Sequence, residues 1–425
     1  MSEIVDVASS VSPVAGASIA SATVGGIWWF ICLHVSPAPQ VGRFNAAYGI
    51  AILTAEVANL GSGYAIIRYF QVAPGQRQAI VRTALAATTV TTLLFVALLG
   101  ALGEVAGAGG PLPRDLSTAC AILLAALGTS WYHVTESLLL AAGRRGTMFA
   151  RASFTAAGRV VLLLILRFLM PMTFEALLVS YTVPALVAAA SASWVMRQEV
   201  FGGLRKGVLL SQPQVKRVLP YAFQSYAGNI VAAITPNILP ILVVWRIGPI
   251  AGARFGAAWY IAGVVMLIPS AISLTTFSTV ARGERRAEYV LRQGMRLQLA
   301  AQIPLIVGIA VLCPFVLPHL GSAYAHLGPP QTLPLLVGVV FIGLTGQVYS
   351  HARVLDGGLR VVIGGQVVQA AIVIPLAILL APRMGVAGVS TAWLAGTAIT
   401  LTLVLVIGLR CLLRPAIAQA HESAT

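Results

Sequence analysis

Long apolar segments separated by short polar ones fill almost the whole chain. Twelve of these segments reach roughly 20 residues, the length at which an α-helix crosses about 30 Å of hydrocarbon. We therefore predict an all-α integral membrane protein with about twelve transmembrane helices. The predicted spans are 13–33, 45–63, 82–102, 117–142, 150–170, 174–196, 221–243, 256–278, 297–317, 333–355, 361–381 and 386–409.

The apolar pattern repeats between the two halves of the chain. VGRFNAAYGIA (41–51) and GARFGAAWYIA (252–262) share six of eleven positions, and a Gly-x-Arg turn follows each of them, at Gly75 and at Gly283. Two copies of a helical unit are typical of transporters. A six-helix unit returns the chain to its starting side, so the copies must be parallel and related by a pseudo-two-fold axis along the membrane normal. We predict an N-terminal lobe at 1–196, a cytoplasmic linker at 197–220 and a C-terminal lobe at 221–425.

Charge is sparse and unevenly placed. Charged residues make up 9% of the chain, whereas soluble domains are about a quarter charged. If the N-terminus is cytoplasmic, the inner segments hold 20 Lys and Arg residues and the outer segments hold six. This asymmetry predicts that both termini face the cytoplasm. Topology and affinity for anionic lipids thus explain the net charge of +15, so no nucleic-acid partner is needed.

Several protein classes lack support in the sequence. The N-terminus carries Glu3 and Asp6 in place of the basic region of a cleavable signal. No polar segment is long enough for a soluble catalytic domain, and no constellation resembles a catalytic site. The four cysteines lie singly, without the spacing of metal ligands, so we expect no disulfide, metal or cofactor and no enzymatic activity. They are Cys32, Cys120, Cys313 and Cys411.

Two glycine-containing segments resemble a known transporter family. NLGSGYAIIRY (59–69) and MGVAGVSTA (384–392) are similar to segments of polysaccharide exporters in the multidrug/oligosaccharidyl-lipid/polysaccharide superfamily. The resemblance implies a flippase that moves a polyprenyl-diphosphate-linked oligosaccharide to the outer leaflet. It also implies an arginine-lined cavity between the lobes that receives the anionic headgroup. The abundance of Arg over Lys, 25 against 2, together with abundant Ala, indicates G+C-rich coding DNA and a bacterial source.

Charges inside the predicted spans are the candidate functional residues, because each costs about 2.5–3.5 kcal/mol to insert. Arg159 is a candidate ligand of a diphosphate headgroup, since guanidinium stays charged and pairs with two phosphate oxygens; an internal ion pair with Glu136 or Glu56 is the alternative. Glu56 and Glu136 could bind a coupling proton or act as permanent counter-ions, and His133 shares a helical face with Glu136.

Three more arginines lie close to the predicted outer surface. Arg43, Arg254 and, more weakly, Arg246 could line the headgroup cavity, or their side chains could reach interfacial water. Arg43 and Arg254 occupy equivalent positions of the repeat, which favours a shared role.

The seventh predicted span is unusually polar. Gln224, Asn229 and Asn237 accompany Pro236 and Pro240 within it. Prolines bend helices, so this span is a candidate gate helix whose amides contact the sugar. Hydrogen bonding between helices explains the same residues equally well.

The function that agrees with these observations is lipid-linked oligosaccharide flipping at the bacterial inner membrane. Two alternatives stay open: a major-facilitator-like solute transporter, and an integral-membrane glycosyltransferase using a polyprenyl-linked sugar. Against the first, the loop after the second span lacks an Asp-Arg-Gly signature; against the second, outer acidic residues are few. Expected partners are the lipid-linked glycan, membrane lipids and the glycan polymerase or glycosyltransferases, with the protein itself monomeric.

Overall fold

The computed structural model describes residues 24–72, 76–105, 116–197, 212–281, 287–352 and 358–422. All regular elements within these ranges are helices, which confirms the all-α prediction. The beginning of the first predicted span, part of each Gly-x-Arg turn and most of the predicted linker lie outside the described residues.

Most of the described helices have the length and composition of membrane spans. Eight qualify on both grounds: α4 (Arg77–Val105), α6 (Arg145–Leu169), α7 (Phe174–Val195), α10 (Pro249–Ala281), α11 (Ala287–Val316), α12 (Pro329–Ala352), α13 (Gly358–Met384) and α14 (Val386–Glu422). Two shorter apolar helices are Val24–Val35 and the second half of α9 (Gln212–Arg246). Helices α2 (Ala38–Asn59) and α5 (Leu116–Ala141) are also long enough to cross, but their charged and polar residues lower their mean hydropathy.

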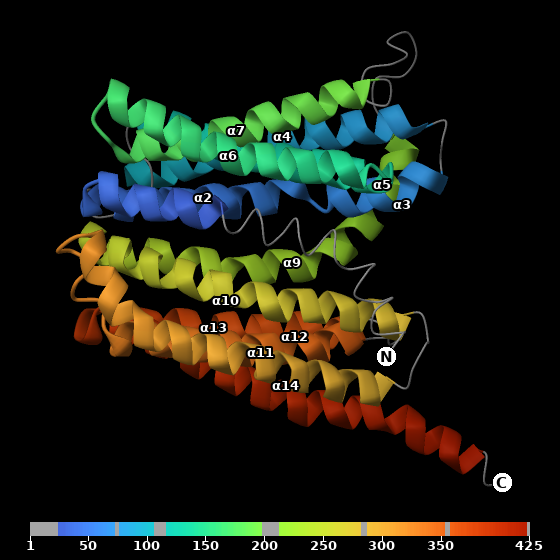
Figure 1. Ribbon diagram of the computed structural model, residues 1–425. Helices are drawn as coiled ribbons and strands as arrows, with labels where there is room; N and C mark the ends of the chain where they lie inside the picture. The colour runs from blue at the N-terminus through green and yellow to red at the C-terminus, as the bar shows by residue number, and fades with distance from the viewer. Residues whose placement is uncertain are drawn as a thin grey trace. The chain divides into compact units, whose positions relative to one another are not determined.

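The described residues form two compact units. The first unit holds those up to Ala253 and the second unit holds those from Arg254 onward, so the boundary falls inside α10. In the first unit α5 is the central helix: it contacts α2, α4, α6, α7 and the short α3 (Ser62–Val72), which run alongside one another in Figure 1.

Helix α2 makes an unusually close backbone contact within the first unit. At Gly42 a Cβ atom would collide with the carbonyl of Pro249, in the first turn of α10. Three residues later, the buried Asn45 donates a hydrogen bond from Nδ2 to the Gly252 carbonyl over 3.1 Å. Small residues permit such approaches between membrane helices. The starts of the two repeated sequence segments therefore touch each other.

The second unit is built around α14. This helix contacts α12 and α13, and α11 packs on α12. Between α13 and α14 the chain reverses at Gly385, whose φ of 59° lies in the left-handed region that favours glycine. This turn lies in the second of the two glycine-containing segments, 384–392.

The sequence repeat has a counterpart in aromatic packing inside each unit. In the first unit Phe44 stacks on Tyr48 with centroids 5.7 Å apart, and Tyr48 meets the edge of Tyr181 on α7 at 4.7 Å. In the second unit Phe255 stacks on Trp259 at 5.4 Å, and Trp259 meets Trp393 on α14 at 4.9 Å.

The repeated segments of α2 and α10 thus make the same two kinds of aromatic contact, with α7 in the first unit and with α14 in the second. Stacked and edge-to-face pairs at these separations are both favourable. Both phenylalanines are fully buried, so the repeated Arg-Phe pair places an aromatic anchor in each unit.

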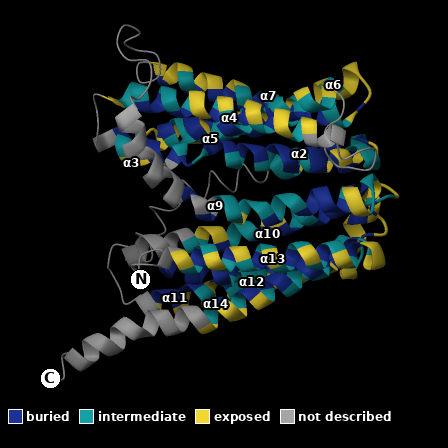
Figure 2. Cartoon of the chain, turned by 180° about the vertical axis from the view of Figure 1, so that it is seen from behind, coloured by how far each residue is buried: buried dark blue, intermediate teal, exposed yellow. Residues whose placement is uncertain are grey.

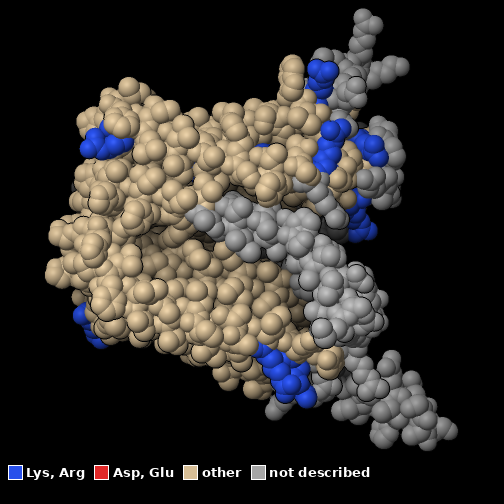
Figure 3. Space-filling model, viewed as in Figure 1, with Lys and Arg blue, Asp and Glu red and all other residues tan. Residues whose placement is uncertain are grey.

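The outward faces of the helices are apolar. Exposed residues of α6 include Phe154 and Phe168, the latter 87% exposed, and Figure 2 shows similar exposed positions along α4 and α14. Such side chains favour hydrocarbon over water. On the face seen in Figure 3, the Lys and Arg side chains lie mainly near the ends of the helices, and no Asp or Glu is visible. This distribution fits helices whose middle lies in lipid.

Candidate functional site

A buried arginine joins α6 to α5 in the first unit. Arg151, only 5% exposed, donates from Nη1 to the Tyr132 carbonyl over 3.1 Å and to Thr135 Oγ1 over 2.7 Å. Its guanidinium carbon lies 3.9 Å from the centre of the Tyr132 ring, a cation–π distance. Its Nη2 lies 3.9 Å from Glu136 Oε1. The sequence alone did not predict this role for Arg151.

Glu136 connects this arginine to a histidine on the same helix. Its other oxygen, Oε2, lies 3.7 Å from His133 Nδ1, one turn earlier on α5. The predicted shared face of these two residues is confirmed. The side chains of Glu136 and His133 are 41% and 40% exposed, so they are accessible, whereas Arg151 beside them is not.

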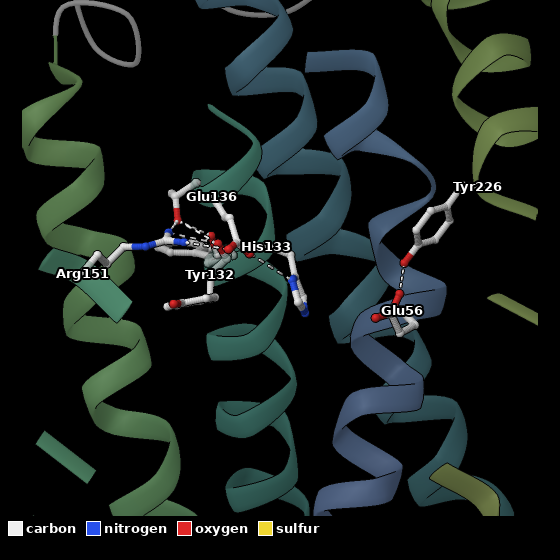
Figure 4. Close-up of polar contacts among 8 residues, drawn as sticks. Glu56, Tyr132, His133, Glu136, Arg151 and Tyr226 are labelled. Carbon is white, nitrogen blue, oxygen red and sulfur yellow. Dashed lines mark hydrogen bonds and ion pairs between the residues drawn. The ribbon is translucent and has the colours of Figure 1, made fainter. Parts of the chain in front are cut away.

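A second carboxylate extends the polar row toward α9. Glu56, on α2, accepts a short hydrogen bond from the Tyr226 hydroxyl on α9. Figure 4 shows the His133 ring lying between Glu136 and the Glu56–Tyr226 pair. One row of polar side chains from four helices therefore crosses the first unit. We call Glu56, His133, Glu136, Arg151 and Tyr226 the polar row.

The polar row can bind a small cation or a proton. It offers two carboxylates, one imidazole and one fixed cation, and the carboxylates and the imidazole are groups whose charge can change. No group of three or more His, Cys, Asp or Glu side chains suited to a metal ion occurs within the described part of the chain. Carboxylate and imidazole side chains can each take up and release a proton.

Arg159 lies two turns beyond Arg151 on α6 and does not join Glu136 or Glu56. Its Nε donates to the Tyr181 carbonyl over 2.9 Å, and its guanidinium carbon lies 3.5 Å from the centre of the Tyr181 ring. Tyr181 belongs to an aromatic group with Tyr48, Phe44 and Trp28. No acidic side chain among the described residues pairs with Arg159. Its terminal nitrogens thus keep donors for an anion.

The other predicted headgroup arginines have different surroundings. Arg43 is exposed, whereas its repeat equivalent Arg254 is half-buried and donates from Nε to the Ala323 carbonyl over 2.7 Å. Arg246, at the end of α9, is exposed and lies 5.2 Å from the Trp245 ring. The equivalence of Arg43 and Arg254 in sequence does not extend to their contacts.

The predicted polar gate helix is α9, which continues as a helix through Pro236 and Pro240. Asn237 donates from Nδ2 to the Ala233 carbonyl, one turn earlier, over 2.8 Å. The side chains of Gln224 and Asn229 lie outside the described part of the chain.

The second unit holds a buried amide network that sequence analysis missed. Thr276 donates to Gln347 Oε1 over 3.0 Å, Gln347 Nε2 donates to Gln298 Oε1 over 3.3 Å, and Gln298 Nε2 donates to Gln302 Oε1 over 2.9 Å. Gln298 Nε2 also donates to the Val340 carbonyl. The network joins α10, α11 and α12 in the low-dielectric interior, where such bonds hold helices together. The four-residue spacing of the two α11 glutamines was the available sequence signal.

Comparison with known proteins identifies the fold. Neither a protein-family model nor a curated protein sequence matches this chain. Among solved structures, a lipid II flippase MurJ in an inward closed conformation matches with a TM-score of 0.73 and 13% identity, over 92% of this chain and 86% of that one.

Two further structures extend the comparison. An outward-facing multidrug resistance MATE transporter of the MOP superfamily matches with a TM-score of 0.66 and 13% identity, over 97% of this chain and 96% of that one. A MOP-superfamily transporter from Pyrococcus furiosus, described as having a binding pocket of reverse polarity, matches with a TM-score of 0.64 and 14% identity, over 94% of each chain. These likenesses agree with the resemblance seen in the two glycine-containing segments and not with a major-facilitator fold.

Proposed function

We propose that this chain, which has the fold of the MOP-superfamily transporters, flips a polyprenyl-diphosphate-linked oligosaccharide across the bacterial inner membrane. The proposal assigns it no enzymatic activity. The single observation that carries the proposal is the environment of Arg159, which lies within a membrane helix. Its Nε donates to the Tyr181 carbonyl, and its guanidinium lies over the Tyr181 ring. Its terminal nitrogens pair with no acidic side chain among the described residues. A diphosphate needs fixed cations to replace its water in a low-dielectric interior.

Arg43, Arg254 and Arg246 are proposed to assist Arg159 with the headgroup. Arg43 and Arg246 are exposed, so their guanidinium groups could reach a headgroup. The Nε of Arg254 already donates to the Ala323 carbonyl, so Arg254 would contact the headgroup through its terminal nitrogens. Gln224, Asn229 and Asn237 on α9 are proposed sugar contacts, because amides match hydroxyl groups as both donors and acceptors.

The polar row is the proposed coupling element. Glu136 and Glu56 would take up and release a proton as the transporter alternates between inward and outward states, with His133 between them. Arg151, bonded to the backbone of α5, keeps a positive charge beside Glu136 throughout. The likeness of the fold to a lipid II flippase in an inward closed conformation and to an outward-facing MATE transporter supports alternating access.

Depletion of the protein tests the proposed substrate. We expect a complete lipid-linked oligosaccharide to accumulate on the inner leaflet, because synthesis continues while translocation stops. The measurement is mass spectrometry of extracted polyprenyl-diphosphate lipids from depleted and complemented cells. Accumulation of a shorter, unextended glycan would instead favour the glycosyltransferase, and an unchanged lipid-linked pool would contradict both.

The proposed orientation places both termini and the 197–220 linker in the cytoplasm. Introducing cysteine at Pro213 into a variant lacking the native cysteines should give a site that an impermeant thiol reagent labels only after the cells are opened. Labelling of Pro213→Cys on intact cells would overturn the orientation. A cysteine at Arg383, in a predicted outer segment, is the positive control for labelling from outside.

A further inference from the structure

A groove of about 200 Å³ lies between α6 and α7 of the first unit. Its apolar wall includes Phe154, which is 53% exposed, and Val195. Its polar lining includes Thr147, Ser191 and Arg151. The groove therefore combines an apolar surface that continues onto the outside of α6 with a small polar end.

Arg151 brings an unused donor to this groove. Nη1 and Nη2 face Tyr132, Thr135 and Glu136, but the buried Nε has no hydrogen-bond partner in the described structure. Burying an N–H group of a charged side chain without a hydrogen-bond acceptor is unfavourable, so a bound acceptor would stabilise it. An anionic oxygen is the acceptor that a guanidinium binds best.

The groove lies at the depth of lipid headgroups. It is formed where α6 begins and α7 ends, and Arg151 is six residues into α6, about 9 Å along the helix. Trp194, 69% exposed, marks the interface on α7, and the guanidinium of Arg197 lies 5.4 Å from its ring. Arg144, also exposed, precedes α6, so this end carries additional positive charge.

We propose that this groove binds an acidic phospholipid such as phosphatidylglycerol. Its phosphate accepts a hydrogen bond from Arg151 Nε, with Thr147 beside it, and an acyl chain follows Phe154. The volume equals about six waters, enough for a phosphoglycerol group. Arg144 and Arg197 attract the anion, which gives preference for acidic over zwitterionic lipids. The lipid is a bound component of the protein and not the transported molecule, so the proposal does not depend on the substrate.

Native mass spectrometry of the purified full-length protein in dodecyl maltoside tests this site. Palmitoyl-oleoyl phosphatidylglycerol and phosphatidylcholine, with the same chains, are titrated separately. We expect the protein to retain phosphatidylglycerol about tenfold more strongly, because both lipids carry the phosphate but only phosphatidylcholine adds a choline cation, which Arg144 and Arg197 repel. Equal retention of both lipids by the wild-type protein would overturn the proposal.

Two variants and one control locate the binding. Ala150→Trp fills the groove from an exposed position and should abolish the preference. Arg151→Gln removes the donor to the phosphate, which both lipids carry, and should weaken the retention of both. Arg167→Gln removes one positive charge from the other end of α6 and should leave the preference intact. Preference retained by a folded Ala150→Trp would show that the lipid binds elsewhere, whatever molecule the protein transports.

Discussion

Replacing Arg159 with glutamine should lower transport by about 10- to 100-fold, the loss expected when one charged hydrogen-bonding group no longer meets a phosphate. Glutamine keeps polarity and part of the bulk but removes the positive charge, and the diphosphate then lacks its deepest cation. The measurement is flipping of a polyprenyl-diphosphate-linked glycan into the outer leaflet of proteoliposomes, normalised to protein content. Membrane abundance should stay normal, because Arg159 is only partly buried and contacts one carbonyl through Nε.

A matched control for this experiment lies on the same helix. Arg167→Gln removes an exposed charge near the end of α6 and should leave transport unchanged. Arg159→Lys keeps the charge but not the fork of donors, and should retain intermediate activity. Wild-type transport by Arg159→Gln would exclude headgroup binding by this residue, and low abundance with normal specific activity would make it a structural link between α6 and α7.

Replacing Arg151 with glutamine should destabilise the folded protein by about 2–4 kcal/mol, since two buried hydrogen bonds from a charged donor are lost. The bonds to the Tyr132 carbonyl and Thr135 hold α6 against α5, and the Tyr132 ring loses its cation. The free energy of unfolding would be measured in mixed detergent micelles as a function of dodecyl sulfate fraction. Arg144→Gln, an exposed change seven residues earlier, should have no measurable effect.

A double variant separates the ion pair from the hydrogen bonds. Glu136 is 41% exposed and 3.9 Å from Arg151, so this pair contributes no more than about 1 kcal/mol. Adding Glu136→Gln to Arg151→Gln should therefore restore less than about 1 kcal/mol. Full recovery of stability in the double variant would show that charge balance with Glu136, and not bonding to the α5 backbone, is the reason for Arg151.

The membrane fold follows from features that the sequence displays locally. Apolar length identifies the spans, and the repeat at 41–51 and 252–262 identifies positions whose aromatic contacts prove to be equivalent in the two units. Helix ends were less accurate: α6 begins at Arg145, five residues before the predicted span, because charged residues at a helix end do not count toward its apolar length. The prediction of two six-helix lobes stays a prediction.

The polar contacts join residues that are far apart in sequence, and the periodicity of apolar residues does not predict which of them meet. Glu56 and Tyr226 are 170 residues apart, and nothing near either residue in sequence indicates the other. Arg144 and Arg145 precede Arg151 at the boundary of a predicted span, and such a cluster of arginines is typical of a cytoplasmic helix end. The spacing of Arg151, four residues from Thr155 and eight from Arg159, was the one local signal that it shares a polar stripe of α6.

The order in which the helices enter the membrane during synthesis matters for the charged residues of α5. The ribosome delivers α5 before α6, so Glu136 and His133 leave the ribosome before Arg151 does. A charged residue costs about 2.5–3.5 kcal/mol to insert at the centre of a helix and less toward its end, where Glu136 lies. Arg151 of α6 bonds to the backbone of α5 and lies beside Glu136, so packing of α6 against α5 lowers the free-energy cost of keeping this charge in the bilayer. We therefore expect α5 and α6 to be retained in the membrane as a pair, joined by the bond between Arg151 and the backbone of α5.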